Sequence, residues 1–158
     1  HRAIPYPVFL VTTLDDAVTL SLAHKRWSLG EKDKMVLDGD VLAVNMAVAA
    51  DDGIRRSFMD TLPLRSRPRM DLKALYQGWI DSVTALLAAE RTGRFTLMTS
   101  AEREAERRAA LMECEDVETR IGMLQSETLK ESQMARRADL NLEIQRLNAR
   151  LDELRERL

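Results

Sequence analysis

The last sixty or so residues constrain the fold most, because little except helix is compatible with them. The stretch from Thr99 to Leu158 contains no proline and a single glycine, and it is rich in residues that favour helix. Towards its end, leucine and isoleucine recur at alternating spacings of four and three, which is the a/d pattern of a heptad repeat. This C-terminal seam comprises Leu140, Ile144, Leu147, Leu151, Leu154 and Leu158. Such a seam requires a partner helix, so we predict that these residues bind a partner.

A second apolar seam lies earlier in the same stretch. It comprises Cys114, Val117, Ile121 and Leu124. Sixteen residues separate its end from the start of the C-terminal seam, so in one straight helix, at about 100° per residue, the seams lie roughly 160° apart. Either the chain turns between Ser126 and Ser132 and the arms pack together, or one helix of about 90 Å serves two partners. Because residues 125–139 contain no glycine or proline, the sequence favours the continuous, projecting helix.

The first part of the chain predicts a small antiparallel sheet. Tyr6–Thr13 is apolar and β-branched, and after an acidic turn Val18–Lys25 alternates between apolar and polar residues. We expect a hairpin whose first strand is buried on both faces and whose second strand lies towards the edge. Residues 35–37 and 41–44 flank Gly39, which readily adopts a positive φ, so a second hairpin is expected there.

Helices are expected to cover this sheet. One begins at Asp71, a good N-cap, and ends at Gly93, a good C-terminal cap. A shorter helix begins at Asp52 or Gly53 and stops before Pro63, while Thr99 opens the next long helix as part of a capping box.

The predicted fold class follows from these elements. It is α+β, with a small antiparallel sheet of two hairpins packed on a helical hairpin and followed by a long C-terminal coiled-coil helix. Residues 1–98 form the α+β domain and residues 99–158 the long helical region. Since the chain starts at His1 immediately before an apolar strand, we expect that an upstream part of this domain is missing.

Composition argues against several classes of function. The net charge of -2 comes from 24 basic and 26 acidic residues that are mixed along the chain, which is unlike a broad nucleic-acid footprint. The one cysteine and the absence of a membrane-length apolar run suit a soluble cytoplasmic protein. No zinc spacing, P-loop or nucleophile elbow is present. We therefore expect no enzymatic activity, no cofactor and no metal.

Acidic pairs are the one feature that a metal-dependent nuclease would need. They occur at Asp15-Asp16, Asp38/Asp40 and Asp51-Asp52. Because all three pairs fall in predicted turns, turn chemistry explains them better than metal binding does.

A polar stripe separates the two seams and offers a nucleic-acid-binding alternative. Arginine and lysine there would contact phosphates, while glutamine and asparagine would reach base edges; a solvated helix surface explains the same residues more simply. The candidates are Lys25 and Arg26 at a strand end, and Lys130, Gln133, Arg136, Arg137 and Asn141 in the stripe. Arg65, Arg67 and Arg69 add a basic connector, which is expected to be a solvated linker or a phosphate-contacting loop.

The order of segments resembles a bacterial domain-of-unknown-function family, number 4391. The resemblance is carried by residues 3–7 before the first strand, 23–26 at the end of the next, 75–80 in the first long helix, and 130–131 through 140–141 before the leucine-rich end. It implies a neighbourhood of helicase and DNA methyltransferase genes in restriction-like or anti-phage clusters, and members that are longer at the N-terminus. It implies no catalytic residues.

Together these observations predict a non-enzymatic accessory or assembly subunit of a bacterial defence system. It would associate through its C-terminal coiled coil, either as a homo-oligomer such as a dimer or with a helical partner protein (a helicase, nuclease or methyltransferase of the same system). A DNA-binding module that uses the basic residues above is the alternative, and a metal-dependent nuclease component is the weaker one.

Overall fold

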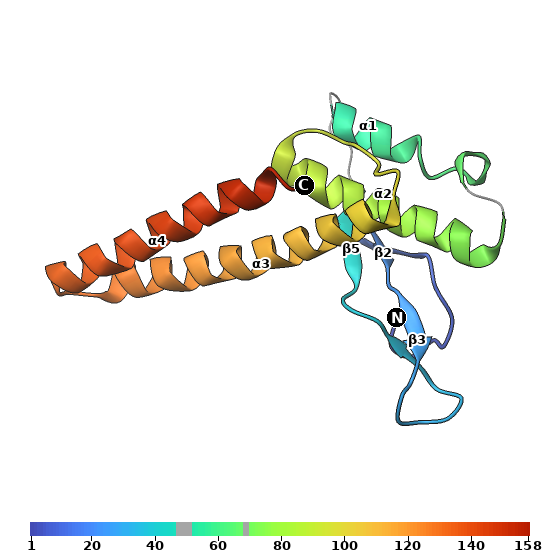
Figure 1. Ribbon diagram of the computed structural model, residues 1–158, viewed down its shortest axis with the longest axis horizontal. Coiled ribbons are helices and arrows are strands. Elements are labelled where there is room, and N and C mark those ends of the chain that lie inside the picture. Colours follow the sequence, from blue (N-terminus) through green and yellow to red (C-terminus); the bar gives the residue numbers. More distant parts are fainter. Residues whose placement is uncertain (47–51, 68–69) are drawn as a thin grey trace. The chain divides into compact units, whose positions relative to one another are not determined.

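The chain folds into two compact units, each of which we describe separately. The computed structural model (Figure 1) describes residues 1–46, 52–67 and 70–158, and the units are His1–Leu97 and Met98–Leu158. The first unit is α+β and the second consists of two helices. Among the described residues, no helix is both long enough and apolar enough to cross a bilayer.

A three-stranded antiparallel sheet forms the centre of the first unit. The strands β1 (Leu10–Leu14) and β2 (Ala17–Leu22) form the predicted hairpin, with Leu10 opposite Ser21 and Leu14 opposite Ala17. The third strand, β5 (Leu42–Asn45), pairs with the other edge of β2. The predicted burial is therefore reversed: β2 is the central strand, with Leu20 and Leu22 fully buried, whereas β1 lies at the edge and is mostly exposed.

The predicted second hairpin is wrong in its pairing. The short strand β4 (Met35–Leu37) pairs with β3 (Lys25–Trp27) in a separate two-stranded sheet, and β5 belongs to the first sheet. Gly39 does adopt a positive φ of 85°, as expected, but its turn carries the chain from one sheet to the other. Strand β3 is not predicted as a separate strand from the sequence, because three residues are too few to show the alternation of apolar and polar side chains.

Helices cover one face of the three-stranded sheet. Helix α1 (Gly53–Met59) begins at Asp52, and helix α2 (Leu72–Thr92) begins at Asp71 and ends at Gly93 with a φ of 74°, so these predicted ends are confirmed. A 3-10 turn, η1 (Leu64–Ser66), lies between them. The core of this unit joins sheet and helices; its buried residues are Leu20, Leu22, Val44, Phe58, Ile80, Val83 and Leu86.

Tyr76 fastens α2 to the strands that it covers. Its hydroxyl accepts a hydrogen bond from the Ala23 N–H at 3.0 Å, and it lies 3.1 Å from the carbonyl oxygens of Val8 and Ala23, to one of which it donates. Burial raises the pKa of the Tyr76 phenol above its ordinary value, and the hydrogen bonds with the backbone of Ala23 and of Val8 oppose the rise. The neutral phenol is thus the form that the fold requires.

The second unit is a helical hairpin, and the prediction of one continuous projecting helix is wrong. Helix α3 (Ala101–Lys130) ends at Glu131, and α4 (Met134–Arg155) begins after Gln133 and runs back beside it (Figure 1). The reversal uses extended backbone at Glu131 and Gln133, with negative φ at both, so it needs neither glycine nor proline. The N-cap of α3 is Ser100, one residue after the predicted Thr99.

Candidate interaction site

The C-terminal seam packs on the earlier seam of the same chain. Cys114, Ile121, Leu151 and Leu154 form one buried cluster, against which the partly buried Val117, Ile144, Leu147 and Leu158 pack. Leu140 is also buried. The three residues of the turn, with extended backbone at Glu131 and Gln133, interrupt the helical phase between the seams, so that the two seams can face each other across the hairpin. In this structure the partner helix of the C-terminal seam is therefore α3.

Ion pairs between the two helices flank this apolar contact. Arg150 donates to Glu113 at 2.6 Å, and Arg120 lies 3.2 Å from Glu143. Hydrogen bonds to Glu113 and then to Glu153 raise the pKa of the Arg150 guanidinium. These pairs are exposed, so each adds little stability on its own. The pairs instead help to fix the position of α4 along α3, since a shift of either helix along the other separates the opposite charges.

A buried charged pair lies at the other end of α3, away from the turn. Arg107 is almost fully buried and lies 3.4 Å from the Glu104 carboxylate, while its Nε donates to the Leu158 carbonyl oxygen at 3.1 Å. Sequence analysis missed both residues, because glutamate and arginine on a charged helix give no sign of burial. The contact ties the end of the chain to the start of the hairpin.

Exposed apolar side chains flank the turn between the helices. Leu129 is 88 % exposed and Met134 is 76 % exposed, and they lie on either side of residues 131–133. Sequence analysis did not select them, because they belong to neither seam. Their position outside both seams could have identified them. A leucine or methionine outside the seam of a two-helix hairpin has no helix of its own unit to cover it, so its side chain is left exposed.

The basic candidates near the turn are in different environments. Arg136 pairs with Glu127 at 3.3 Å and with Glu131 at 3.2 Å, so its charge is largely neutralised. Lys130, Gln133, Arg137 and Asn141 are exposed. Five of the seven nucleic-acid candidates, Arg136 included, are thus exposed near the turn, beside acidic groups.

The candidates in the first unit have partners within that unit. Lys25 donates to the carbonyl oxygens of His1 and Ile4, the latter at 2.7 Å, and Arg26 lies 3.2 Å from Asp38. Lys25 therefore holds the N-terminal segment against β3. Lys25 and Arg26 thus belong to the first unit, whereas the other five nucleic-acid candidates belong to the hairpin.

The basic connector is not simply a solvated linker. Arg67 is buried, and its guanidinium donates to the Gly78 carbonyl and, at 2.9 Å, to the Ser82 hydroxyl of α2. Burial lowers the pKa of Arg67, whereas the charge of Asp81 opposes that change. Arg65 is exposed, and Arg69 lies outside the described residues.

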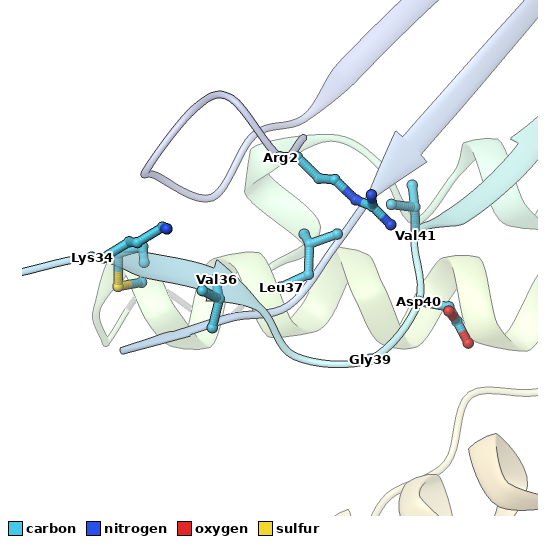
Figure 2. Close-up of a pocket in the computed structure, with 8 residues that line it drawn as sticks. Arg2, Lys34, Val36, Leu37, Gly39, Asp40 and Val41 are labelled. Atoms are coloured by element: carbon cyan, nitrogen blue, oxygen red, sulfur yellow. The ribbon is translucent and has the colours of Figure 1, made fainter. Parts of the chain in front are cut away.

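A shallow hollow of about 410 Å³ lies beside β4 and the turn that follows it. Figure 2 shows that its wall is apolar at Val36, Leu37 and Val41, with Arg2 and Lys34 at its margin and the Asp40 carboxylate turned away. Lys34 also pairs with Glu31 at 2.7 Å. The hollow thus lacks a convergent set of polar groups of the kind that an active site needs.

The acidic pairs occupy turns in the part of the chain that the structure describes. Asp15 has a φ of 50° in the turn between β1 and β2, and Asp52 caps α1. Asp51 lies outside the described residues. Within residues 1–46, 52–67 and 70–158 there is no group of three or more potential metal ligands.

These features define a class: an α+β protein that carries a self-closed helical hairpin. A family model described as a domain of unknown function, number 4391, matches residues 1–151 of the 158. The chain belongs to this family, and the resemblance is confirmed. No curated protein and no solved structure matches the chain.

Proposed function

We propose that this chain is a non-enzymatic accessory or assembly subunit of a bacterial restriction-like or anti-phage defence system. In this proposal its two seams form a short antiparallel coiled coil within the chain, and the end of that coiled coil binds a partner protein. The C-terminal seam then acts indirectly, by holding the hairpin closed and presenting its turn. The defence role rests on the gene neighbourhood that the family resemblance implies.

The exposure of Leu129 and Met134 is the observation that carries this proposal. A large apolar side chain that is nearly fully exposed at the end of a rigid element gains free energy when a partner covers it. The two residues are separated only by the end of α3 and the turn, so one partner surface can cover both. The surrounding polar residues, among them Lys130 and Arg137, would form the rim of such an interface.

Charge supports a protein partner more than a nucleic acid. Acidic residues outnumber basic residues in Met98–Leu158. Near the turn, the carboxylates of Glu127 and Glu131 accompany Arg136. A phosphate backbone would be repelled by these carboxylates, and few cations would remain to release counterions on binding.

The test is co-expression of the chain with a helicase or DNA methyltransferase of the kind that the family resemblance implies in its gene neighbourhood. We expect a complex whose dissociation constant rises roughly tenfold or more when Leu129→Glu and Met134→Glu are combined, because loss of an interface anchor costs over about 1 kcal/mol. Met112→Glu is the matched control, since Met112 is 57 % exposed on α3 but lies far from the turn along the helix. Equal affinity for all three chains, or no complex with either neighbour, would contradict the proposal.

Nucleic-acid binding remains the second candidate, supported by the exposed Lys130, Gln133 and Arg137. Titration of duplex and single-stranded DNA over a series of salt concentrations separates it from the first candidate. If it holds, log K falls linearly with log salt, and Arg137→Glu makes the slope shallower. A flat response at low salt would exclude this role.

A further inference from the structure

The hollow beside β4 lies along a strand edge that can accept another strand. Strand β4 pairs with β3 on one side, and no described strand pairs with its other side. The Asp38 N–H donates to the His24 carbonyl at 3.0 Å, which marks a hydrogen-bonded pair at the end of this ladder. Such pairs alternate along an antiparallel ladder, so the backbone groups of Met35 and Leu37 point away from β3. Both residues line the hollow, which therefore offers backbone donors and acceptors to an extended chain.

The wall of the hollow suits an apolar side chain. Val36 and Leu37 are half-buried, and Val41 is 41 % exposed. The volume of about 410 Å³ lies within the range of ligand-binding hollows. An apolar side chain seated there would remove these surfaces from water.

Cations at the margin of the hollow favour an acidic ligand. Figure 2 shows the Arg2 side chain extended toward Val41, and Arg2 makes no ion pair with the other residues that the structure describes. The Lys34 side chain is 54 % exposed although it pairs with Glu31. Asp40, the carboxylate of the lining, is turned away. A ligand carboxylate would thus meet cations at this margin, whereas a ligand ammonium group would be repelled.

We propose that the hollow and the outer edge of β4 bind an extended acidic segment of a partner protein, in which apolar residues alternate with aspartate or glutamate. The segment adds to β4 as a strand, through the backbone groups of Met35 and Leu37. It places an apolar side chain in the hollow and carboxylates near Arg2 and Lys34. This surface belongs to the first unit and does not depend on the partner proposed for the turn of the hairpin.

Three peptides separate the contributions of charge and of strand pairing. Fluorescence anisotropy is measured while the full chain is added to a labelled short peptide of alternating valine and glutamate. We expect this peptide to bind. A peptide of alternating valine and lysine should not bind, because its ammonium groups meet the two cations. The valine and glutamate peptide with N-methylated backbone amides should not bind either, because it cannot donate to the strand edge.

Substitutions in the chain then locate the site. Arg2→Glu should weaken binding of the acidic peptide about tenfold, because it replaces a cation at the margin by an anion. Val41→Asp should also weaken it, because it places a carboxylate in the apolar wall. Arg65→Glu is the matched control and should leave the affinity unchanged, since Arg65 is an exposed arginine of the same unit that does not line the hollow. Far-UV circular dichroism checks that each variant folds.

The opposite results would overturn the proposal. No binding of the acidic peptide by the natural chain, or equal binding of the lysine peptide, would show that the hollow does not select an acidic segment. An equal loss of affinity in Arg2→Glu and Arg65→Glu would indicate general attraction between charges and not a site. Undiminished binding of the N-methylated peptide would exclude pairing with the edge of β4.

Discussion

The two units of this chain reach their cores by different routes. In the hairpin, α3 packs against the next helix along the chain, and a three-residue connection sets the geometry. In the first unit, β5 pairs with β2 although β3 and β4, the two strands of the other sheet, lie between them in the sequence. Helix α2 adds contacts from still further along the chain. One core is thus local in sequence and the other is not.

This difference determines how each unit should respond to change. Because the hairpin buries one narrow seam, its stability depends on a few leucines and on helix propensity. The first unit has a core supplied from several elements, together with backbone hydrogen bonds that fasten its layers. Four sets of substitutions test the comparison, from the largest expected effect to the smallest.

Leu154→Ala should have the largest effect, confined to the hairpin. Leu154 is fully buried in the seam, and truncation of a buried leucine costs about 2–5 kcal/mol. Denaturant unfolding measures it, followed by helical circular dichroism together with the fluorescence of Trp27 and Trp79, which both lie in the first unit. We expect the helical signal to melt earlier while the tryptophan signal changes little. Met112→Ala, at an exposed position, is the control; an equal loss there, or a matching shift of the tryptophan signal, would contradict the local character of the hairpin.

Tyr76→Phe should destabilise the first unit by about 1–2 kcal/mol at neutral pH, because the buried Ala23 N–H loses its acceptor and a backbone carbonyl loses its donor. The tryptophan signal should report this loss, with the hairpin unaffected. Denaturant midpoints of the two proteins at the same pH give the difference.

The same residue makes a pH prediction with a definite sign. The folded-state pKa of Tyr76 is raised above its ordinary value of 10.0. The stabilisation from the neutral phenol is therefore complete below about pH 10, and it is lost as the pH rises through the higher folded-state value. The stability difference between the natural chain and Tyr76→Phe should shrink over that alkaline range. A constant difference up to strongly alkaline pH would show that the phenol is not held neutral by the fold.

The comparison also explains which parts of the structure could be predicted from sequence. Helix ends at Asp52, Asp71 and Gly93 followed from caps, because capping is a local interaction. The apolar face of each hairpin helix followed from spacing. The first hairpin, β1 with β2, was predicted with its pairing. The partners of β4 and β5 were not, since an apolar strand of three or four residues pairs equally well with several others and only the tertiary fold decides.

The turn of the hairpin shows a second limit. Residues 131–133 carry no glycine or proline, so residue preference favoured a continuous helix, whereas the phase break between the seams was compatible either with a reversal or with a helix that serves two partners. The reversal occurs because it buries two apolar seams, and that gain exceeds the small helix propensity of three residues. The exposed site at Leu129 and Met134 depends on this reversal and was not predictable before it.

A pair of glycine substitutions isolates helix propensity from packing. Gly122→Ala, inside α3, should stabilise the hairpin by about 0.5–1 kcal/mol, because nothing lies within 4 Å of the added methyl group. Gly93→Ala should destabilise the first unit by about 1–2 kcal/mol, since alanine is strained at a φ of 74° although the space is equally open. Thermal unfolding of both variants gives the signs. Two changes of the same sign would contradict the conformational explanation.

The smallest effect is expected for the exposed pair of Arg120 and Glu143, which joins α3 to α4 at 3.2 Å. A double-mutant cycle with alanine at both positions should give a coupling energy of about 0.2–1 kcal/mol, and added salt should reduce it. The matched control is Arg155 and Asp152, which pair at 2.8 Å within α4 and so do not depend on the reversal of the chain.

The exchanged pair, Arg120→Glu with Glu143→Arg, should recover most of the stability lost in either single charge reversal, because the opposite charges meet again across the two helices. The exchange is measured at a protein concentration at which light scattering shows no association through the hairpin. Recovery of stability under that condition assigns the ion pair to one chain. If instead recovery requires high protein concentration, α3 and α4 of different copies are in contact, and the local character of the hairpin core is wrong. The pair of lowest energy therefore gives the sharpest distinction between a hairpin closed within one chain and helices exchanged between two.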